Sequence, residues 1–315
     1  MTPTSSPTTD RVSTSGLGFA ASAYILWGAM PIVFFTLKES GAIEIVAWRI
    51  VLSLVFCALL LLVTRGYVRV LAIIRDRRTF WMLGLGGALV VVNWSIYVYA
   101  SVNGHIVEAA LGYFTNPIVT VLLGVIILRE RLRSLQWIAL GVSAVAVLVL
   151  AIGYGSFPWI ALGLAFSFGL YGLVKKSVGP KADAIGGLAV ETAFLAPIAI
   201  VVLLVMSATG ALTVGTAGTG HTVLTLCLGV ITATPLILFA AAARRLPLTY
   251  MGLAQYLAPI LQLIVGVVIF QEAMPLERWL GFAIVWVALA ILTFDLFRHS
   301  SSTRLGSLAE APGAP

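Results

Sequence analysis

Ten apolar stretches of about twenty residues follow one another along this chain, and each is long enough to cross a bilayer as one helix. Only short connections separate them, so no soluble domain is inserted. Charged residues make up 10% of the chain, against about 25% in soluble domains, so lipid must cover much of its surface. The sequence therefore predicts an all-α integral membrane protein with ten transmembrane helices, at 16–37, 45–64, 79–102, 106–128, 134–153, 157–175, 184–206, 221–243, 248–270 and 276–297.

The distribution of lysine and arginine predicts how these helices are oriented. Sixteen of the 19 basic residues lie in the two tails and in every second connection. The other connections hold only Lys38 and Arg278, and the remaining basic residue, Arg49, lies within a span. Cytoplasmic segments carry the excess of Lys and Arg in membrane proteins. We therefore expect both termini in the cytoplasm and the protein in the cell (inner, cytoplasmic) membrane, with disordered tails at 1–15 and 298–315.

The chain contains an internal repeat. A shift of 142 residues places Pro117 on Pro259 and Gly87 on Gly229. Each repeat holds five helices, and because five is odd, the second repeat enters the membrane in the opposite orientation. Inverted repeats are typical of secondary transporters, whose substrate sites lie near the midplane between the repeats. The two repeats are expected at 16–153 and 157–297.

Three long motifs resemble a known family. They are LGYFTNPIVTVLLGVIILRERL at 111–132, LGLAFSFGLYGLVKK at 162–176 and FAIVWVALAI at 282–291. They are similar to the RarD proteins of the EamA-type family, within the drug/metabolite transporter superfamily. This resemblance covers nearly the whole chain and implies a ten-helix permease of two five-helix halves, with export of a small metabolite or drug-like solute as the expected direction.

Two charged residues within the spans are candidates for coupling or gating. A charge at a helix centre costs about 2.5–3.5 kcal/mol on insertion scales, so Arg49 and Glu191 need a reason to be there. The 142-residue shift superposes them, which places opposite charges at equivalent sites on opposite sides of the midplane. Arg49 would attract an anionic group and Glu191 a proton or cation. The alternative is that each reaches its nearer interface or pairs locally, Arg49 with Glu44.

Polar residues on four helices predict the wall of a substrate cavity. Asn93, Tyr97 and Ser101 recur every four residues and form one stripe on the third helix. Thr120 and Gln262 are symmetry mates near midspan in the fourth and ninth helices. The alternative is hydrogen bonding between closely packed helices. The complete expected cavity lining is Asn93, Trp94, Tyr97, Tyr113, Asn116, Thr120, Tyr171, Gln255, Tyr256 and Gln262.

Prolines and acidic residues near helix ends complete the candidate site. Pro117, Pro235 and Pro259 are expected to kink their helices, because proline removes one backbone hydrogen bond and frees a carbonyl one turn earlier. Glu108 begins the fourth helix near His105 and is a candidate outer gate. Glu272 precedes the tenth helix, where we expect it to stabilise that helix N-terminus.

The sequence also argues against several other classes of protein. It holds no HExxH, GxSxG or GxxxxGK[ST] motif, so we expect no enzyme activity, no metal and no cofactor. Its basic residues are spread over many connections, which argues against a nucleic-acid partner. The expected partners are a small-molecule substrate and the lipid bilayer, with a proton as the candidate coupling ion. The oligomeric state stays open between a monomer and a homodimer.

Together these patterns predict a secondary active transporter that works by alternating access. Two alternatives stay open, an uncoupled channel or uniporter, and a non-transport subunit of a membrane assembly. A solid core between the halves, with Asn93 and Gln262 packed away, would count against transport.

Overall fold

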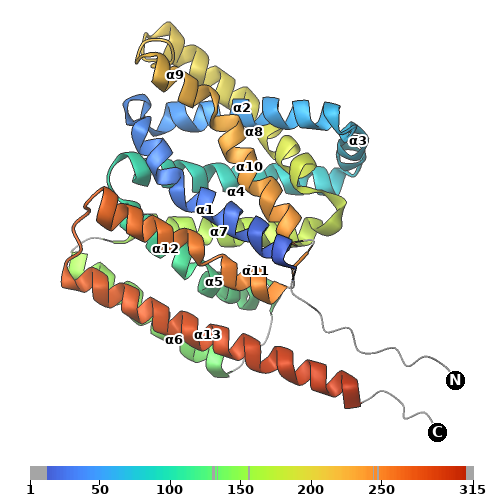
Figure 1. Cartoon of the computed structure of the whole chain (residues 1–315), viewed down its shortest axis with the longest axis vertical. Helices are drawn as coiled ribbons and strands as arrows, with labels where there is room; N and C mark the ends of the chain where they lie inside the picture. The colour runs from blue at the N-terminus through green and yellow to red at the C-terminus, as the bar shows by residue number, and fades with distance from the viewer. Residues whose placement is uncertain are drawn as a thin grey trace, which may run out of the picture.

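The computed structural model describes residues 13–309 except 130, 131, 133, 155, 156, 244 and 247, and every regular element in this part of the chain is helical (Figure 1). The first half forms α1 (Thr14–Thr36), η1 (Lys38–Ser40), α2 (Gly41–Val63), α3 (Tyr67–Arg75), α4 (Arg77–Val102), α5 (Ile106–Leu128) and α6 (Ser134–Tyr154). The second half forms α7 (Trp159–Val178), η2 (Gly179–Lys181), α8 (Ala184–Ala208), α9 (Thr219–Leu226), α10 (Leu228–Ala243), α11 (Leu248–Ala254), α12 (Leu257–Ile264), η3 (Val265–Ile269) and α13 (Leu276–Ala309).

The helices agree with the apolar stretches of the sequence. Among the described residues, seven are long and apolar enough to cross a membrane, at Thr14–Thr36, Lys38–Val63, Arg77–Val102, Ile106–Ile127, Ala184–Ala208, Thr219–Ala243 and Leu276–Asp295. Shorter apolar helices at Ser134–Val149 and Leu257–Ile269 coincide with two further expected spans. The remaining expected span, 157–175, coincides with α7, which ends in a turn that contains two lysines.

The structure departs from the expected boundaries in three places. The connection at 65–78 contains the helix α3, whose Ile73 is buried while its arginines remain at the surface. The expected helix 248–270 is interrupted between α11 and α12, one turn before Pro259, whose missing N–H cannot bond to the carbonyl of Gln255. The last helix, α13, continues past residue 297 to Ala309, so residues 298–309 of the expected tail are helical.

Side-chain caps and ion pairs define one end of the helix bundle. Asp76 Oδ1 accepts the backbone N–H of Thr79 at the start of α4, and Asp183 Oδ1 accepts that of Gly186 at the start of α8. Such caps satisfy donors that a helix start leaves free. Lys181 Nζ lies 2.7 Å from Asp76, and Arg69 lies 3.0 Å from Asp183. These contacts join α3, α4 and the α7–α8 turn.

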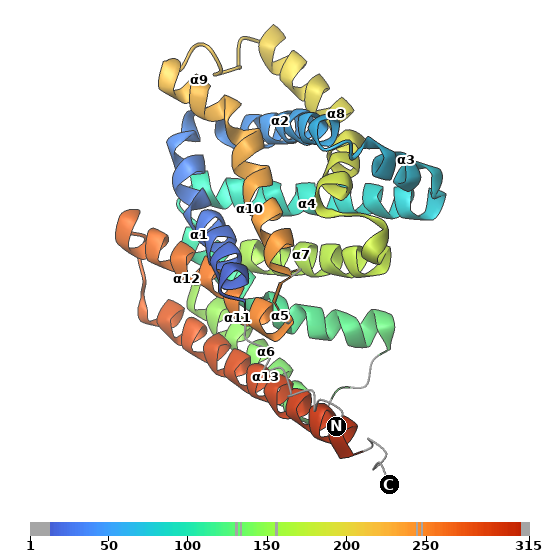
Figure 2. The same ribbon diagram turned by 45° about the vertical axis from the view of Figure 1, so that its right-hand side comes forward.

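The two halves interleave instead of lying side by side. Helix α1 packs on α10, α2 on α8, α4 and α5 on α7, and α6 on α13. Figures 1 and 2 both show α6 and α13 together along one edge of the molecule. Two close crossings use glycine: a Cβ on Gly87 would lie 2.9 Å from the Glu191 carbonyl oxygen, and one on Gly229 would meet the Leu52 carbonyl. These two glycines are the pair that the 142-residue shift superposes.

The outer surface of the helices is apolar. Large hydrophobic side chains are exposed on both halves, including Val63 and Leu62 on α2, Ile198 and Leu204 on α8, and Phe294 on α13. Soluble monomers rarely expose apolar area on this scale. A lipid environment accounts for it, as the composition predicts.

Candidate functional site

Three helices meet at Asn93 in the centre of the molecule. Its Nδ2 donates to the Leu164 carbonyl at 3.2 Å and to Ser167 Oγ at 3.1 Å, both on α7. The Tyr113 hydroxyl on α5 donates to Asn93 Oδ1 at 3.1 Å. Asn93 is only 2% exposed, so these bonds satisfy an amide that would otherwise be costly to bury. The structure thus joins three residues that lie far apart in the sequence.

A second polar contact lies around the main-chain carbonyl of Trp27 in α1. The Tyr97 hydroxyl from α4 approaches this oxygen at 3.5 Å, and Gln262 Nε2 from α12 approaches it at 3.4 Å. Gln262 Oε1 is buried without a hydrogen-bond partner in the described part of the chain. We call Trp27, Asn93, Tyr97, Tyr113 and Gln262 the central group.

A row of aromatic rings connects the central group to α7. Tyr97 and Tyr113 lie with ring centroids 5.5 Å apart, Tyr113 and Phe168 6.0 Å apart, and Phe168 and Tyr171 6.0 Å apart. Edge-to-face and tilted contacts at these spacings are favourable. The row leads from the α4–α5 contact to Tyr171.

Arg49 projects from α2 into the same region. Its Nε donates to Thr232 Oγ1 on α10 at 3.0 Å. The guanidinium lies 3.9 Å from the ring centroid of Trp94 and 5.3 Å from that of Phe34. Arg49 is 4% exposed and Trp94 is 7% exposed, so the cation–π contact is desolvated and correspondingly strong.

The predicted alternative of a local Arg49–Glu44 pair is wrong. The Glu44 carboxylate accepts the backbone N–H of Thr213 at 3.1 and 3.2 Å and that of Val214 at 3.3 Å. These donors belong to the segment between α8 and α9, so a fully buried carboxylate is satisfied there. The other alternative, in which Arg49 reaches the interface, does not fit its burial.

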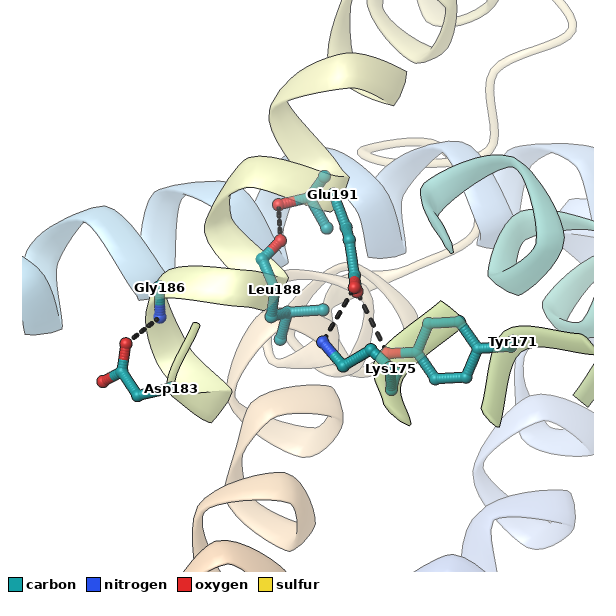
Figure 3. A network of polar contacts seen from close by, with 7 residues as sticks. Tyr171, Lys175, Asp183, Gly186, Leu188 and Glu191 are labelled. Atoms are coloured by element: carbon teal, nitrogen blue, oxygen red, sulfur yellow. Dashed lines mark hydrogen bonds and ion pairs between the residues drawn. The ribbon is translucent and has the colours of Figure 1, made fainter. Parts of the chain in front are cut away.

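Glu191 forms the second charged site, shown in Figure 3. Lys175 Nζ on α7 lies 2.8 Å from Glu191 Oε1, and the Tyr171 hydroxyl donates to Oε2 at 3.1 Å. The glutamate side chain is fully buried, whereas that of Lys175 is 32% exposed. The buried Glu191 carboxylate therefore forms its ion pair with a partly exposed lysine in the last turn of α7.

Two other glutamates lie at the start of α5. Glu272 accepts the backbone N–H of Ile106 at 2.6 Å and that of Val107 at 2.9 Å, at the start of α5. The prediction that it serves the following helix is wrong, although the capping chemistry is the expected kind. Glu108, the expected outer gate, lies partly buried in the first turn of α5.

Several predicted cavity residues do not join the central group. Asn116 and Thr120 bond to each other at 3.0 Å, and Thr120 is exposed. Gln255 is exposed at the interruption before α12, and Tyr256 packs against a cluster that includes Phe282 and Val285 of α13. A regular helix would place Gln255, seven residues before Gln262, on the same face as Gln262.

The three predicted kink prolines have different surroundings. Pro117 lies within a continuous α5, and Pro235 lies buried within α10. Pro259 lies in the first turn of α12, directly after the interruption between α11 and α12. In the described helices, it is the only one of the three prolines that lies next to an interruption.

The centre of the molecule is closed in this conformation. Asn93 and Gln262 are 2% and 3% exposed. Two small cavities, each of about 10 Å³ and so with room for about one water molecule, lie beside Leu111 and Pro158 and beside Cys57 and Ala233. This burial of both amides is the outcome that, from the sequence alone, counts against transport.

Sequence reasoning missed the partners of the charged residues. In the sequence, Lys175 counts only as one of the basic residues that predict the orientation of the helices. Its spacing of four residues from Tyr171 is the one signal that the two side chains lie on the same face of their helix. Nothing in the local pattern indicates Thr232 or Met30 beside Arg49.

Comparison with known proteins identifies the family. The model of the EamA-like transporter family matches residues 14–152. Protein RarD of Streptomyces exfoliatus is 46% identical over 95% of this chain and 94% of its own length. An uncharacterized transporter of Pseudomonas aeruginosa is 40% identical over 90% of this chain and 94% of its own.

A solved structure supports the fold. A protein crystal structure that is 17% identical superposes with a TM-score of 0.54, over 90% of this chain and 98% of that one. At this identity the likeness concerns the fold alone. Because the RarD relative matches nearly from end to end, this chain belongs to the RarD proteins of the EamA-like transporter family, membrane transporters of the drug/metabolite type.

Proposed function

We propose that this protein is a secondary active transporter that moves a small solute across the cytoplasmic membrane by alternating access, with export as its direction. The observation that carries the proposal is the exchange symmetry of the helix contacts. The contact of α1 with α10 has its counterpart in that of α7 with α4, and the contact of α1 with α12 has its counterpart in that of α7 with α5. Such exchange is expected of two inverted repeats around a shared site.

This symmetry supports ten membrane crossings in two inverted sets of five. Seven are the long apolar helices, and α6, α7 and the α11–α12–η3 segment supply the other three. The tails and every second connection hold 16 basic residues, whereas the other connections hold two. This difference supports cytoplasmic termini. The expected surroundings are a lipid bilayer, and the protein acts as a monomer or homodimer.

The closed centre favours a carrier over an open channel. A carrier exposes its site to one side at a time, so it passes through a conformation that is closed to both. The burial of Asn93 and Gln262, which taken alone counts against transport, is also what a carrier shows in that closed conformation. A continuously open pathway would instead leave polar side chains in contact with water.

Glu191 is the proposed coupling residue. Its carboxylate is buried and its ammonium partner is partly exposed at the end of α7. Protonation of Glu191 would remove the attraction between the two groups and free Lys175 to leave the helix contact. A proton gradient would thereby act on the side-chain link that Lys175 and Tyr171 make between α7 and α8.

Efflux from proteoliposomes tests this function and requires no candidate substrate. Vesicles containing the purified protein are loaded with the small-molecule extract of bacterial cytoplasm, and the released solutes are identified by mass spectrometry with and without a pH gradient. We expect protein-dependent release of a limited set of solutes, accelerated by the gradient. Glu191→Gln should abolish the acceleration, whereas Glu277→Gln, an exposed glutamate of α13, should retain it.

Other outcomes would contradict the proposal in distinct ways. If the unsubstituted protein releases solutes at the same rate with and without the pH gradient, the protein is a channel or uniporter. No protein-dependent release of any solute would favour a non-transport role in a membrane assembly.

A further inference from the structure

The guanidinium of Arg49 has one edge without adequate hydrogen-bond acceptors. Its Nε is bonded to Thr232, but Nη1 has no partner, and Nη2 has only the Met30 thioether sulfur at 4.0 Å. Sulfur of this kind is a weak acceptor. Stacking on Trp94 occupies a face of the guanidinium, and a face contact does not satisfy N–H groups that point outward in its plane.

No carboxylate of the described residues compensates this charge. The groups around Arg49 are Met30 and Phe34 from α1, Trp94 and Tyr97 from α4, Tyr113 from α5 and Thr232 from α10. All of them are formally neutral. An isolated buried charge is costly unless it is paired.

The two nearest acidic candidates by sequence and symmetry are already engaged. Glu44, one to two turns away on α2, accepts backbone donors of Thr213 and Val214. Glu191, the symmetry mate of Arg49, is held by Lys175 and Tyr171. An anion that pairs with Arg49 must therefore come from outside the described chain.

We infer that the Nη1–Nη2 edge of Arg49 binds the carboxylate of the transported solute, which makes small carboxylate-bearing organic molecules the substrate class. This inference rests on the proposed transport function and specifies its cargo. The planar edge of a guanidinium matches the two oxygens of a carboxylate. The neighbouring rings of Trp94, Tyr97 and Tyr113 provide an aromatic wall for the rest of the molecule.

The charge at the site matches one negative group. Arg49 is a single cation stacked on Trp94, and Lys175, in the last turn of α7, is already paired with Glu191. A single arginine neutralises a monocarboxylate, whereas a doubly charged phosphate would leave one charge uncompensated. The site is closed in this structure, so the carboxylate reaches Arg49 only when the two halves open toward one side.

The efflux experiment tests this inference when the released solutes are sorted by charge. The variants are Arg49→Met, Arg49→Lys and the matched control Arg77→Met, which removes an exposed arginine at the start of α4. We expect carboxylates to dominate the released set. Their release should fall about tenfold or more in Arg49→Met, since a hydrogen bond to a charged group is worth at least that factor. Arg49→Lys should retain part of it, and Arg77→Met should match the unsubstituted protein.

Failure of this inference differs from failure of the transport function. If solutes are released but carry no carboxylate, or if Arg49→Met releases carboxylates as fast as the unsubstituted protein, the carboxylate site is wrong and transport stands. If no solute is released, the transport function is wrong and the inference falls with it.

The stability of Arg49→Met in the absence of solutes separates binding from a structural role. Arg49→Met removes an unpaired buried charge, and it also loses the bond to Thr232 and the stacking on Trp94, so we expect an apparent melting temperature close to that of the unsubstituted protein. A large decrease in both Arg49→Met and Arg49→Lys would show that the guanidinium holds the helices together and would overturn the inference.

Discussion

Lys175 Nζ lies 2.8 Å from Glu191 Oε1, which joins the last turn of α7 to the second turn of α8. The two helices are connected by the turn η2, so the pair closes a contact across neighbouring elements. The pair holds the Glu191 carboxylate, which is protonated and deprotonated in the proposed mechanism.

Removal of one member of this pair should destabilise the protein more than removal of both. Lys175→Met leaves the Glu191 carboxylate buried with only Tyr171, and we expect a loss of about 3 kcal/mol, the low end for buried pairs because the ammonium is partly exposed. The double variant Lys175→Met/Glu191→Gln should recover much of it. Thermal unfolding in detergent measures both, with Arg75→Met, at an exposed arginine of α3, as the control. Equal losses in the single and double variants would contradict the pairing.

Asn93→Leu should weaken the contact of α4 with α5 and α7. It removes the bonds to Tyr113, Ser167 and the Leu164 carbonyl, so we expect a loss of about 1–3 kcal/mol from stranded polar groups. Thermal unfolding measures the effect. Ser95→Ala is the matched control, because Ser95 is exposed on the same helix and bonds only to its own helix carbonyl at Val91; it should be nearly neutral.

Glu272→Gln should loosen the start of α5. A neutral amide oxygen cannot replace both carboxylate contacts to Ile106 and Val107, and the loss of one capped donor and of the charge near a helix N-terminus costs about 1 kcal/mol. Hydrogen exchange at these two amides should become faster. Glu277→Gln should leave it unchanged, and unchanged exchange in Glu272→Gln itself would refute the cap.

Alanine at the glycine crossings should disturb the packing of the halves. Gly87→Ala places a Cβ against the Glu191 main chain, and Gly229→Ala places one against that of Leu52. Overpacking of this kind costs about 1–3 kcal/mol. Gly141→Ala is the control, since nothing lies near its added carbon and alanine favours a helix. Melting temperatures should fall in the first two variants alone.

The Asp76 carboxylate should titrate unusually low. The hydrogen bond from Lys181, followed by those from Thr79, lowers the pKa of Asp76 from 3.8 to about 2. Because the folded-state pKa is depressed, the stabilising contact is complete above about pH 4 and is lost as the pH falls toward 2. Lys181→Met should raise the pKa toward 3.8, measured by carboxyl-carbon NMR; an unchanged value would contradict the pairing.

The sequence predicts the helices well because burial in lipid requires long apolar runs. It also finds Arg49, Glu191 and Asn93, since polar groups within a span need partners. The partners of these residues are not predicted: Arg49 bonds to Thr232 across 183 residues of sequence, which no helical periodicity indicates. The interruption before α12 also leaves Gln255 exposed, although a regular helix extrapolated from the pattern places Gln255 on the same face as the buried Gln262.

The interleaving of the halves has a consequence for biogenesis. Arg49 and Asn93 belong to the first half, yet Thr232 and Ser167, to which they bond, are synthesised later. A nascent chain that ends near residue 153 therefore has inserted helices whose polar side chains still lack their partners. Insertion and folding are separate steps for this protein, and a product truncated at that point is an orphan that membrane proteases can recognise by its unsatisfied polar groups.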